Sequence, residues 1–125
     1  DEVEQDTLPR LNGPEGQAAD VLAMYHVLAP LFAQLELPVE ALDLSSGGSW
    51  RVELESGANI EMGRGSVAEI TARVRRFLKT LTQVTSRYGR RANAVESADL
   101  RHENGYAIRL AGVSTTVATV AVPKK

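Results

Sequence analysis

Histidine, serine and aspartate are the first side chains to test for chemistry, because metal binding and nucleophilic catalysis need them at characteristic spacings. The two histidines, His26 and His102, form neither a His-x-x-x-His nor a His-Glu-x-x-His pair. Ser45 and Ser46 lie near Asp43, but no Gly-x-Ser-x-Gly turn is present. Cysteine is absent, which excludes disulfides and thiolate ligands. We therefore predict no catalytic residue, no metal site and no cofactor.

A glycine-rich turn, Gly63-Arg64-Gly65-Ser66, precedes a segment with helical periodicity. Amides at a helix N-terminus can bind phosphate. The turn lacks the spacing and the lysine of a phosphate-binding loop. Ser66 and Glu69 have the spacing of a capping box, which occupies the amides itself. We interpret the turn as a strand-to-helix connection.

Charge is distributed in blocks that the net charge of −2 conceals. Residues 1–63 carry a net charge of −10, residues 64–91 of +7 and residues 92–125 of +1. The basic block could attract nucleic acid, an anionic lipid or an acidic protein. It lacks the exposed aromatic residues of a single-strand nucleic-acid surface, and basic runs are usually solvated helix faces. We therefore expect little contribution to folding or partner binding from Arg73, Arg75, Arg76 and Lys79.

The segment from Arg101 to Leu110 has the pattern of a terminal hairpin. Asn104-Gly105 is a strong turn signal, and alternation follows at Tyr106, Ile108 and Leu110. A terminal strand can leave its outward N–H and C=O groups free for a partner's strand. A protected edge is equally compatible with the pattern. The register, and with it the residues whose amides point outward, stays open.

The elements that position these residues follow from periodicity. Apolar residues at helical spacing predict helices from Pro14 to Leu35 and over 66–88, and Pro30 should kink or end the first helix. Alternation predicts strands at 39–44, 50–55, 58–62, 94–101 and 106–110. The order α-β-β-β-α-β-β predicts an α+β fold, a mostly antiparallel sheet with two amphipathic helices on one face.

Length and composition are those of one folded domain. The chain has 125 residues, of which 43% are hydrophobic and 24% charged. No apolar run reaches the length of a membrane span. We assign residues 1–112 to the domain and 113–125 to a C-terminal strand or flexible tail.

Four motifs in order along residues 8–110 resemble the FtsQ/DivIB family of bacterial cell-division proteins. They are Leu8-Pro9-Arg10-Leu11-x-Gly13-Pro14-Glu15-Gly16, Ser49-Trp50, Met62-Gly63-Arg64-Gly65 and Asp99-Leu100-Arg101-x-x-x-Gly105. The resemblance implies the C-terminal periplasmic β-domain, expected to lack its first strand. It implies a non-enzymatic scaffold of the divisome at the septum, whose parent is anchored in the inner membrane by a single-pass segment outside this chain.

The resemblance also implies partners, the coiled-coil proteins FtsB and FtsL, with FtsB adding a strand to the last strand of the domain. The family's contact positions fall on Arg101, His102, Asn104, Gly105 and Leu110. His102 replaces a tyrosine, Asn104 a serine and Leu110 a tryptophan, and a further contact arginine of the family falls on Gly47. With the strand between them, the expected partner-binding residues are Arg101, His102, Asn104, Gly105, Tyr106, Ala107, Ile108, Arg109 and Leu110.

The alternative function is an anionic-surface or nucleic-acid binding module acting through the basic helix 66–88. Salt dependence separates the two, because phosphate binding weakens steeply with salt. Under the favoured interpretation nucleic acid is not a partner.

Overall fold

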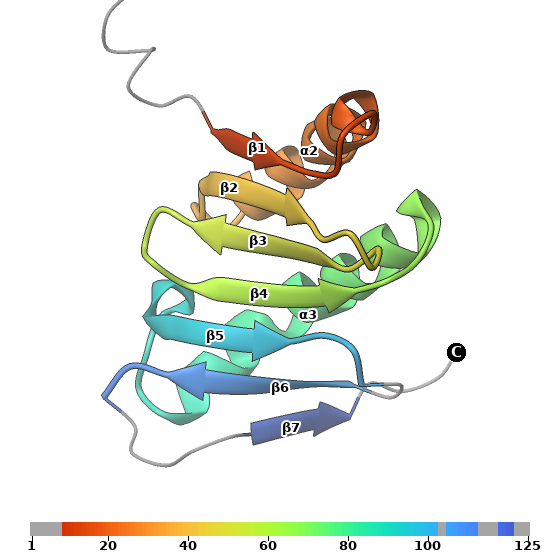
Figure 1. Ribbon diagram of the computed structural model, residues 1–125. Coiled ribbons are helices and arrows are strands. Elements are labelled where there is room, and N and C mark those ends of the chain that lie inside the picture. Colours follow the sequence, from red (N-terminus) through yellow and green to blue (C-terminus); the bar gives the residue numbers. More distant parts are fainter. Residues whose placement is uncertain (1–8, 103–104, 113–117, 122–125) are drawn as a thin grey trace, which may run out of the picture.

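The computed structural model describes residues 9–102, 105–112 and 118–121, and its strands form one sheet (Figure 1). The spatial order of the strands, β1 to β7, is their order in the chain. The bounds are β1 Arg10–Asn12, β2 Val39–Leu44, β3 Trp50–Leu54, β4 Asn59–Gly63, β5 Val95–Asp99, β6 Gly105–Leu110 and β7 Ala118–Ala121.

The sheet is mixed, so the prediction of a mostly antiparallel sheet is wrong. Strand β1 runs parallel to β2, and β4 runs parallel to β5. The other four pairings are antiparallel. The physical reason is that a helix joins each parallel pair, which carries the chain back to the end where the previous strand began. The predicted order also lacked β1, whose three residues are too short for an alternation pattern. The sequence predicts a strand or a tail for residues 113–125, and Ala118–Ala121 within them form β7.

Both helices cover one face of the sheet (Figure 1). Helix α2 spans Ala18–Ala33 and α3 spans Val67–Arg87, followed by a short 3₁₀ helix at Ala92–Ala94. Helix α2 begins later than predicted, because Pro14 first forms a turn in which its carbonyl accepts the Gln17 amide at 3.1 Å. It also continues past Pro30 instead of ending there.

The ends of α3 confirm the local signals of the sequence. The Glu69 amide donates to the Ser66 hydroxyl at 3.1 Å, and the Ser66 amide donates to the Glu69 carboxylate at 2.8 Å. At the other end Gly89 takes a φ of +69°, and the Arg90 amide bonds back to the Thr85 carbonyl at 2.9 Å. The helix therefore starts and stops where its capping residues require.

The core lies between the sheet and the two helices. Its fully buried side chains come from both layers, and among them are Phe32, Val52, Ile60, Ile70, Val74 and Leu81. Within the described ranges, no helix combines the length and apolar character that a membrane crossing requires.

Candidate partner-binding edge of the sheet

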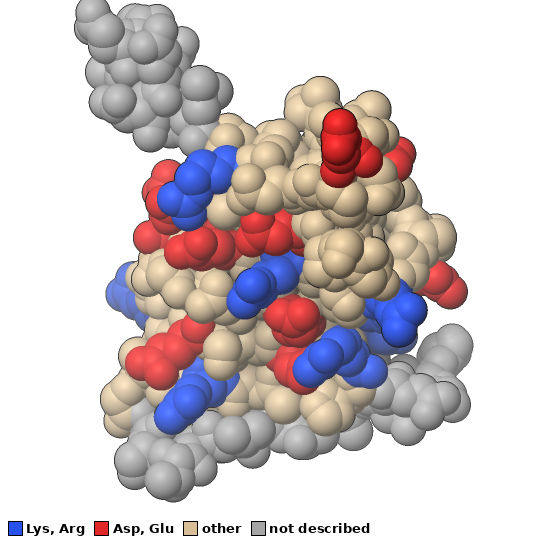
Figure 2. Space-filling view, viewed as in Figure 1, with Lys and Arg blue, Asp and Glu red and all other residues tan. Residues whose placement is uncertain are grey.

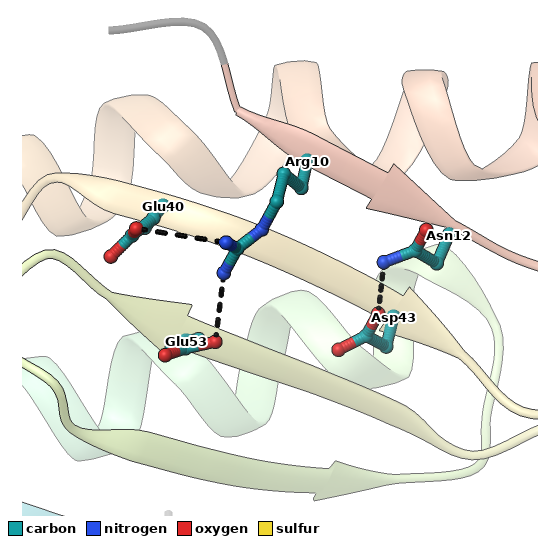
Figure 3. A network of polar contacts seen from close by, with 5 residues as sticks. All are labelled: Arg10, Asn12, Glu40, Asp43 and Glu53. Atoms are coloured by element: carbon teal, nitrogen blue, oxygen red, sulfur yellow. Dashed lines mark hydrogen bonds and ion pairs between the residues drawn. The ribbon is translucent and has the colours of Figure 1, made fainter.

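The first edge of the sheet is the short strand β1, whose polar side chains Arg10 and Asn12 reach over β2 (Figure 3). Arg10 reaches across β2, with its guanidinium 3.2 Å from the Glu53 carboxylate and 3.9 Å from that of Glu40. The Asn12 amide group donates to Asp43 at 2.7 Å. Short strands with charged side chains resist pairing with other chains, so this edge is protected.

The opposite end of the sheet differs from the sequence-based expectation. Strand β6 is paired with β7 in the register Gly105↔Ala121, Tyr106↔Val120, Ala107↔Thr119 and Ile108↔Ala118. Of the two alternatives that the sequence left open for Tyr106–Leu110, the free outer edge is therefore wrong, because β7 pairs with it. Strand β7 is the outermost strand of the described sheet. The predicted Asn104 turn lies outside the described residues.

The structure also resolves which amides of β6 point outward. The Ala111 amide donates to the Ala94 carbonyl at 2.7 Å, on the β5 side. Amide direction alternates along a strand, so the N–H groups of Ala107 and Arg109 face β5. Those of Tyr106 and Ile108 face β7. These two residues therefore present the hydrogen-bonding groups of β6 to its outer neighbour.

The side chains of β6 divide between the two faces of the sheet. Tyr106, Ile108 and Leu110 are each 2% exposed and lie in the core. The Tyr106 ring packs edge-on against Phe77 at a centroid distance of 4.9 Å, and its burial raises the pKa of the Tyr106 hydroxyl. A partner strand can reach these residues only through their backbone.

The side chain of Arg101, two residues after the end of β5, is held in one orientation. Its Nε and Nη2 donate to the two carboxylate oxygens of Asp99 at 2.9 and 2.8 Å, which holds the pKa of Asp99 below its usual range. Gly63 leaves room for this arginine, because a Cβ there would lie 2.8 Å from its Cγ. The Gly63 and Arg101 motifs of the sequence therefore meet in space. His102, next in the chain, is exposed.

A shallow hollow of about 410 Å³ lies on the face opposite the helices. Side chains of both charges stand next to one another on this face (Figure 2). The hollow brings together four of the predicted residues, Arg101, Ala107, Ile108 and Arg109. It adds Arg51 and Glu61, which the sequence prediction missed. The sequence placed Arg51 and Glu61 on alternating strands. Their position beside Arg101 and Arg109 depends on the parallel pairing of β4 with β5, which was not predicted.

The basic helix α3 is the second candidate surface. Arg75 and Lys79 are exposed and line, with Leu31 of α2 and Leu35 just after that helix, a hollow of about 490 Å³. Arg73 differs from the sequence-based expectation, since its Nη1 donates to the carbonyls of Met62 at 2.9 Å and Arg64 at 2.6 Å. Arg73 therefore stabilises the turn between β4 and α3. In the part of the chain that the structure describes, no three His, Asp or Glu residues gather to hold a metal ion.

Comparison with known proteins supplies the context for this edge. The family described as "Cell division protein FtsQ/DivIB, C-terminal" matches residues 1–101. Three curated relatives, each named "Cell division protein FtsQ", illustrate the range of similarity. The relative from Thiomonas arsenitoxydans is 39% identical over 113 residues, which cover 90% of this chain and 40% of the relative.

The other two relatives are more distant. That from Burkholderia pseudomallei is 38% identical over 107 residues, covering 85% of this chain and 42% of the relative. That from Escherichia coli is 30% identical over 101 residues, covering 81% of this chain and 36% of the relative. The chain thus spans about two fifths of the length of these relatives.

Proposed function

This chain belongs to the FtsQ/DivIB family of cell-division proteins, and we propose that it serves there as a non-enzymatic scaffold domain of the divisome. Its role is to recruit the FtsB–FtsL coiled coil during septation, by accepting a β-strand of FtsB at the β6 end of the sheet. The parent protein is placed in the inner membrane by a single-pass segment outside this chain, with the domain in the periplasm.

The single observation that carries the proposal is the pairing of β6. Tyr106 and Ile108 direct their backbone groups away from β5, and a strand pairs with β6 on that side. This geometry suits β-augmentation, in which main-chain hydrogen bonds supply affinity. The opposite edge of the sheet is short and carries Arg10. The β6 end therefore suits the pairing of a partner strand better than the β1 edge does.

Specificity would come from the side chains next to this edge. Arg109 is exposed on the open face and lies 3.8 Å from the Glu96 carboxylate. Arg101 is oriented by Asp99 at the same hollow. Of the two, Arg109 stands on β6 itself, next to the position of a strand that pairs with β6, whereas Arg101 lies beside Gly63 of β4. Strand addition reads alternate side chains in this way.

The experiment that tests the proposal is a titration of the domain with a periplasmic FtsB fragment, alone and with FtsL, at two salt concentrations. Strand addition predicts that the affinity changes less than tenfold between about 50 and 200 mM salt. Binding through the basic helix to an anionic surface predicts a loss of ~10³-fold or more when six or more phosphates are contacted.

Two double variants serve as a matched pair in this titration. Arg101→Ala with Arg109→Ala removes the charges at the β6 end and should weaken FtsB binding. Arg75→Glu with Lys79→Glu reverses charges on exposed α3 and should leave the affinity within about tenfold, roughly 1.4 kcal/mol. A larger loss in the α3 variant than in the β6 variant would favour the alternative function and contradict ours.

A further inference from the structure

We infer that β7 is an internal strand occupying the place of the partner's strand on β6, and that it must leave when the partner binds. The inference rests on the proposed function. It adds a regulatory property to the edge, since the same chain carries both the edge and a strand that competes for it. Residues 118–121, Ala-Thr-Val-Ala, form that competing strand.

The outward backbone groups of β6 can serve one strand at a time. The register places Tyr106 opposite Val120 and Ile108 opposite Ala118. Because the amides of Tyr106 and Ile108 face β7, these are the hydrogen-bonded pairs of the antiparallel ladder. A partner strand therefore has two options: it replaces β7, or it pairs with the outer side of β7 through Thr119 and Ala121.

The position of Arg109 favours replacement. Ala107 and Arg109 form the β6 side of the hollow, which extends from there over β5 and β4 to Arg51 of β3. Neighbouring strands lie about 4.8 Å apart, so a partner on the outer side of β7 would be one further strand spacing from Arg109. A strand that replaces β7 is the one whose side chains lie next to Arg109.

The length of β7 makes replacement feasible. Its four residues pair with Gly105 to Ile108, whereas β6 extends to Leu110. As part of the same chain it acts at an effective concentration of roughly millimolar order. It therefore covers the edge when no partner is present and lowers the partner's apparent affinity by the fraction of edge that is free.

Amide hydrogen exchange of the full chain, with and without the periplasmic FtsB fragment, tests the inference directly. We expect the amides of Ala118 and Val120 to lose protection when the fragment binds. Those of Tyr106 and Ile108 should stay protected, because the partner's strand takes over their hydrogen bonds. If Ala118 and Val120 stay protected while Thr119 and Ala121 gain protection, the partner pairs with β7 and the inference is wrong.

A matched pair of proline variants gives an independent test by affinity. Val120→Pro removes an amide that faces β6, and Thr119→Pro removes one that faces outward. If β7 occupies about nine tenths of the edges, Val120→Pro should bind the fragment about tenfold more tightly, roughly 1.4 kcal/mol. Thr119→Pro should bind like the unmodified chain.

The remaining outcomes separate the inference from the proposed function. If Thr119→Pro weakens binding and Val120→Pro does not strengthen it, the partner pairs with the outer side of β7. That outcome would contradict the replacement of β7 but would still support strand addition. Binding with no exchange change at any of these amides would overturn replacement too. If neither the full chain nor Val120→Pro binds the fragment, with or without FtsL, the proposed function itself fails.

Discussion

Tyr106 of β6 and Thr80 of α3 share a hydrogen bond of 2.6 Å between their hydroxyl oxygens. The Thr80 hydroxyl lies 3.1 Å from the carbonyl of Arg76 and donates to it, because a carbonyl can only accept. With its hydrogen used there, Thr80 accepts the hydrogen bond that the Tyr106 hydroxyl donates. This contact joins the strand at the proposed binding edge to the longest helix of the fold. It fixes the Tyr106 hydroxyl on the helix side of the sheet, away from the outer side of β6.

Removing only the hydroxyl of Tyr106 tests this connection. Tyr106→Phe should lower the free energy of unfolding by about 0.5–1.5 kcal/mol, the usual net value of one hydrogen bond, because the ring packing on Phe77 is kept. Tyr88→Phe, at an exposed tyrosine, is the control and should be neutral. Urea denaturation measures both. Equal effects in the two variants would contradict a role for the Thr80 bond.

The two faces of β6 predict opposite responses to truncation. Ile108→Ala should cost about 2–5 kcal/mol of unfolding free energy, because its side chain is 2% exposed in the core. Arg109→Ala, one residue along, should change stability by less than about 0.5 kcal/mol, because it removes an exposed side chain. Thermal and chemical denaturation measure both losses. The larger loss in Arg109→Ala would mean that β6 is shifted by one residue, because such a shift turns every side chain to the other face.

Gly63 is favoured as glycine both by its positive φ and by the lack of space for a Cβ. Gly57 has the positive φ alone, so comparing the two positions separates the two effects. Both take positive φ, +81° and +97°, but only Gly63 would place a Cβ within 4 Å of other atoms, 2.8 Å from Arg101 Cγ. Gly57→Ala should cost about 1–3 kcal/mol for the strained backbone alone. Gly63→Ala should cost more, since Arg101 must also move away from Asp99. A smaller loss for Gly63→Ala would contradict this packing.

Arg73 and Arg75 lie two residues apart on α3 but should behave differently. Arg73→Met removes the donor to two carbonyls of the turn before the helix, and we expect a loss of about 1–3 kcal/mol. Arg75→Met is the control at an exposed position and should be nearly neutral. Differential scanning calorimetry of both variants measures the difference. Equal melting temperatures would mean that the two hydrogen bonds of Arg73 contribute nothing measurable to stability, as expected for the solvated helix face that the sequence suggested.

The bond between Asp99 and Arg101 predicts a pH dependence. The pKa of Asp99 is lowered below its ordinary 3.8 in the folded state. Its carboxylate therefore contributes stability above about pH 4, and this contribution is lost as the pH falls through the lowered pKa. Asp99→Asn should destabilise the domain at pH 7, and the difference from the unmodified chain should disappear as the pH falls through the lowered pKa of Asp99.

A double-variant cycle isolates the partner of Asp99 in that experiment. Arg101→Met should show the same loss of stability at pH 7, and adding it to Asp99→Asn should cost little more, because the shared bond is already gone. Fully additive losses at pH 7 would mean that Asp99 is stabilised by something other than Arg101.

Local signals in the sequence determined the helices and the central strands. The Ser66–Glu69 capping box, the glycine after α3 and the alternation from Val39 to Gly63 depend on neighbours within a few residues, so their physics is present in the sequence itself. The same holds for the inward side chains of β6, whose period of two is a property of any extended strand. Family membership was likewise predicted from short motifs and is confirmed by the match over residues 1–101.

Only the tertiary structure decided how the strands are ordered and what covers β6. The parallel pairing of β4 with β5 joins residues 59–61 to 97–99 across a helix, and no local pattern records it. It is this pairing that places Glu61 beside Asp99 in the hollow. The sequence of residues 113–125 is compatible with a strand or a tail, and Ala118–Ala121 are a strand because β6 offers backbone groups for them to pair with. Caps and alternation depend on residues a few positions apart. Hydrogen bonds between distant segments form only when the packing of the whole domain brings those segments together.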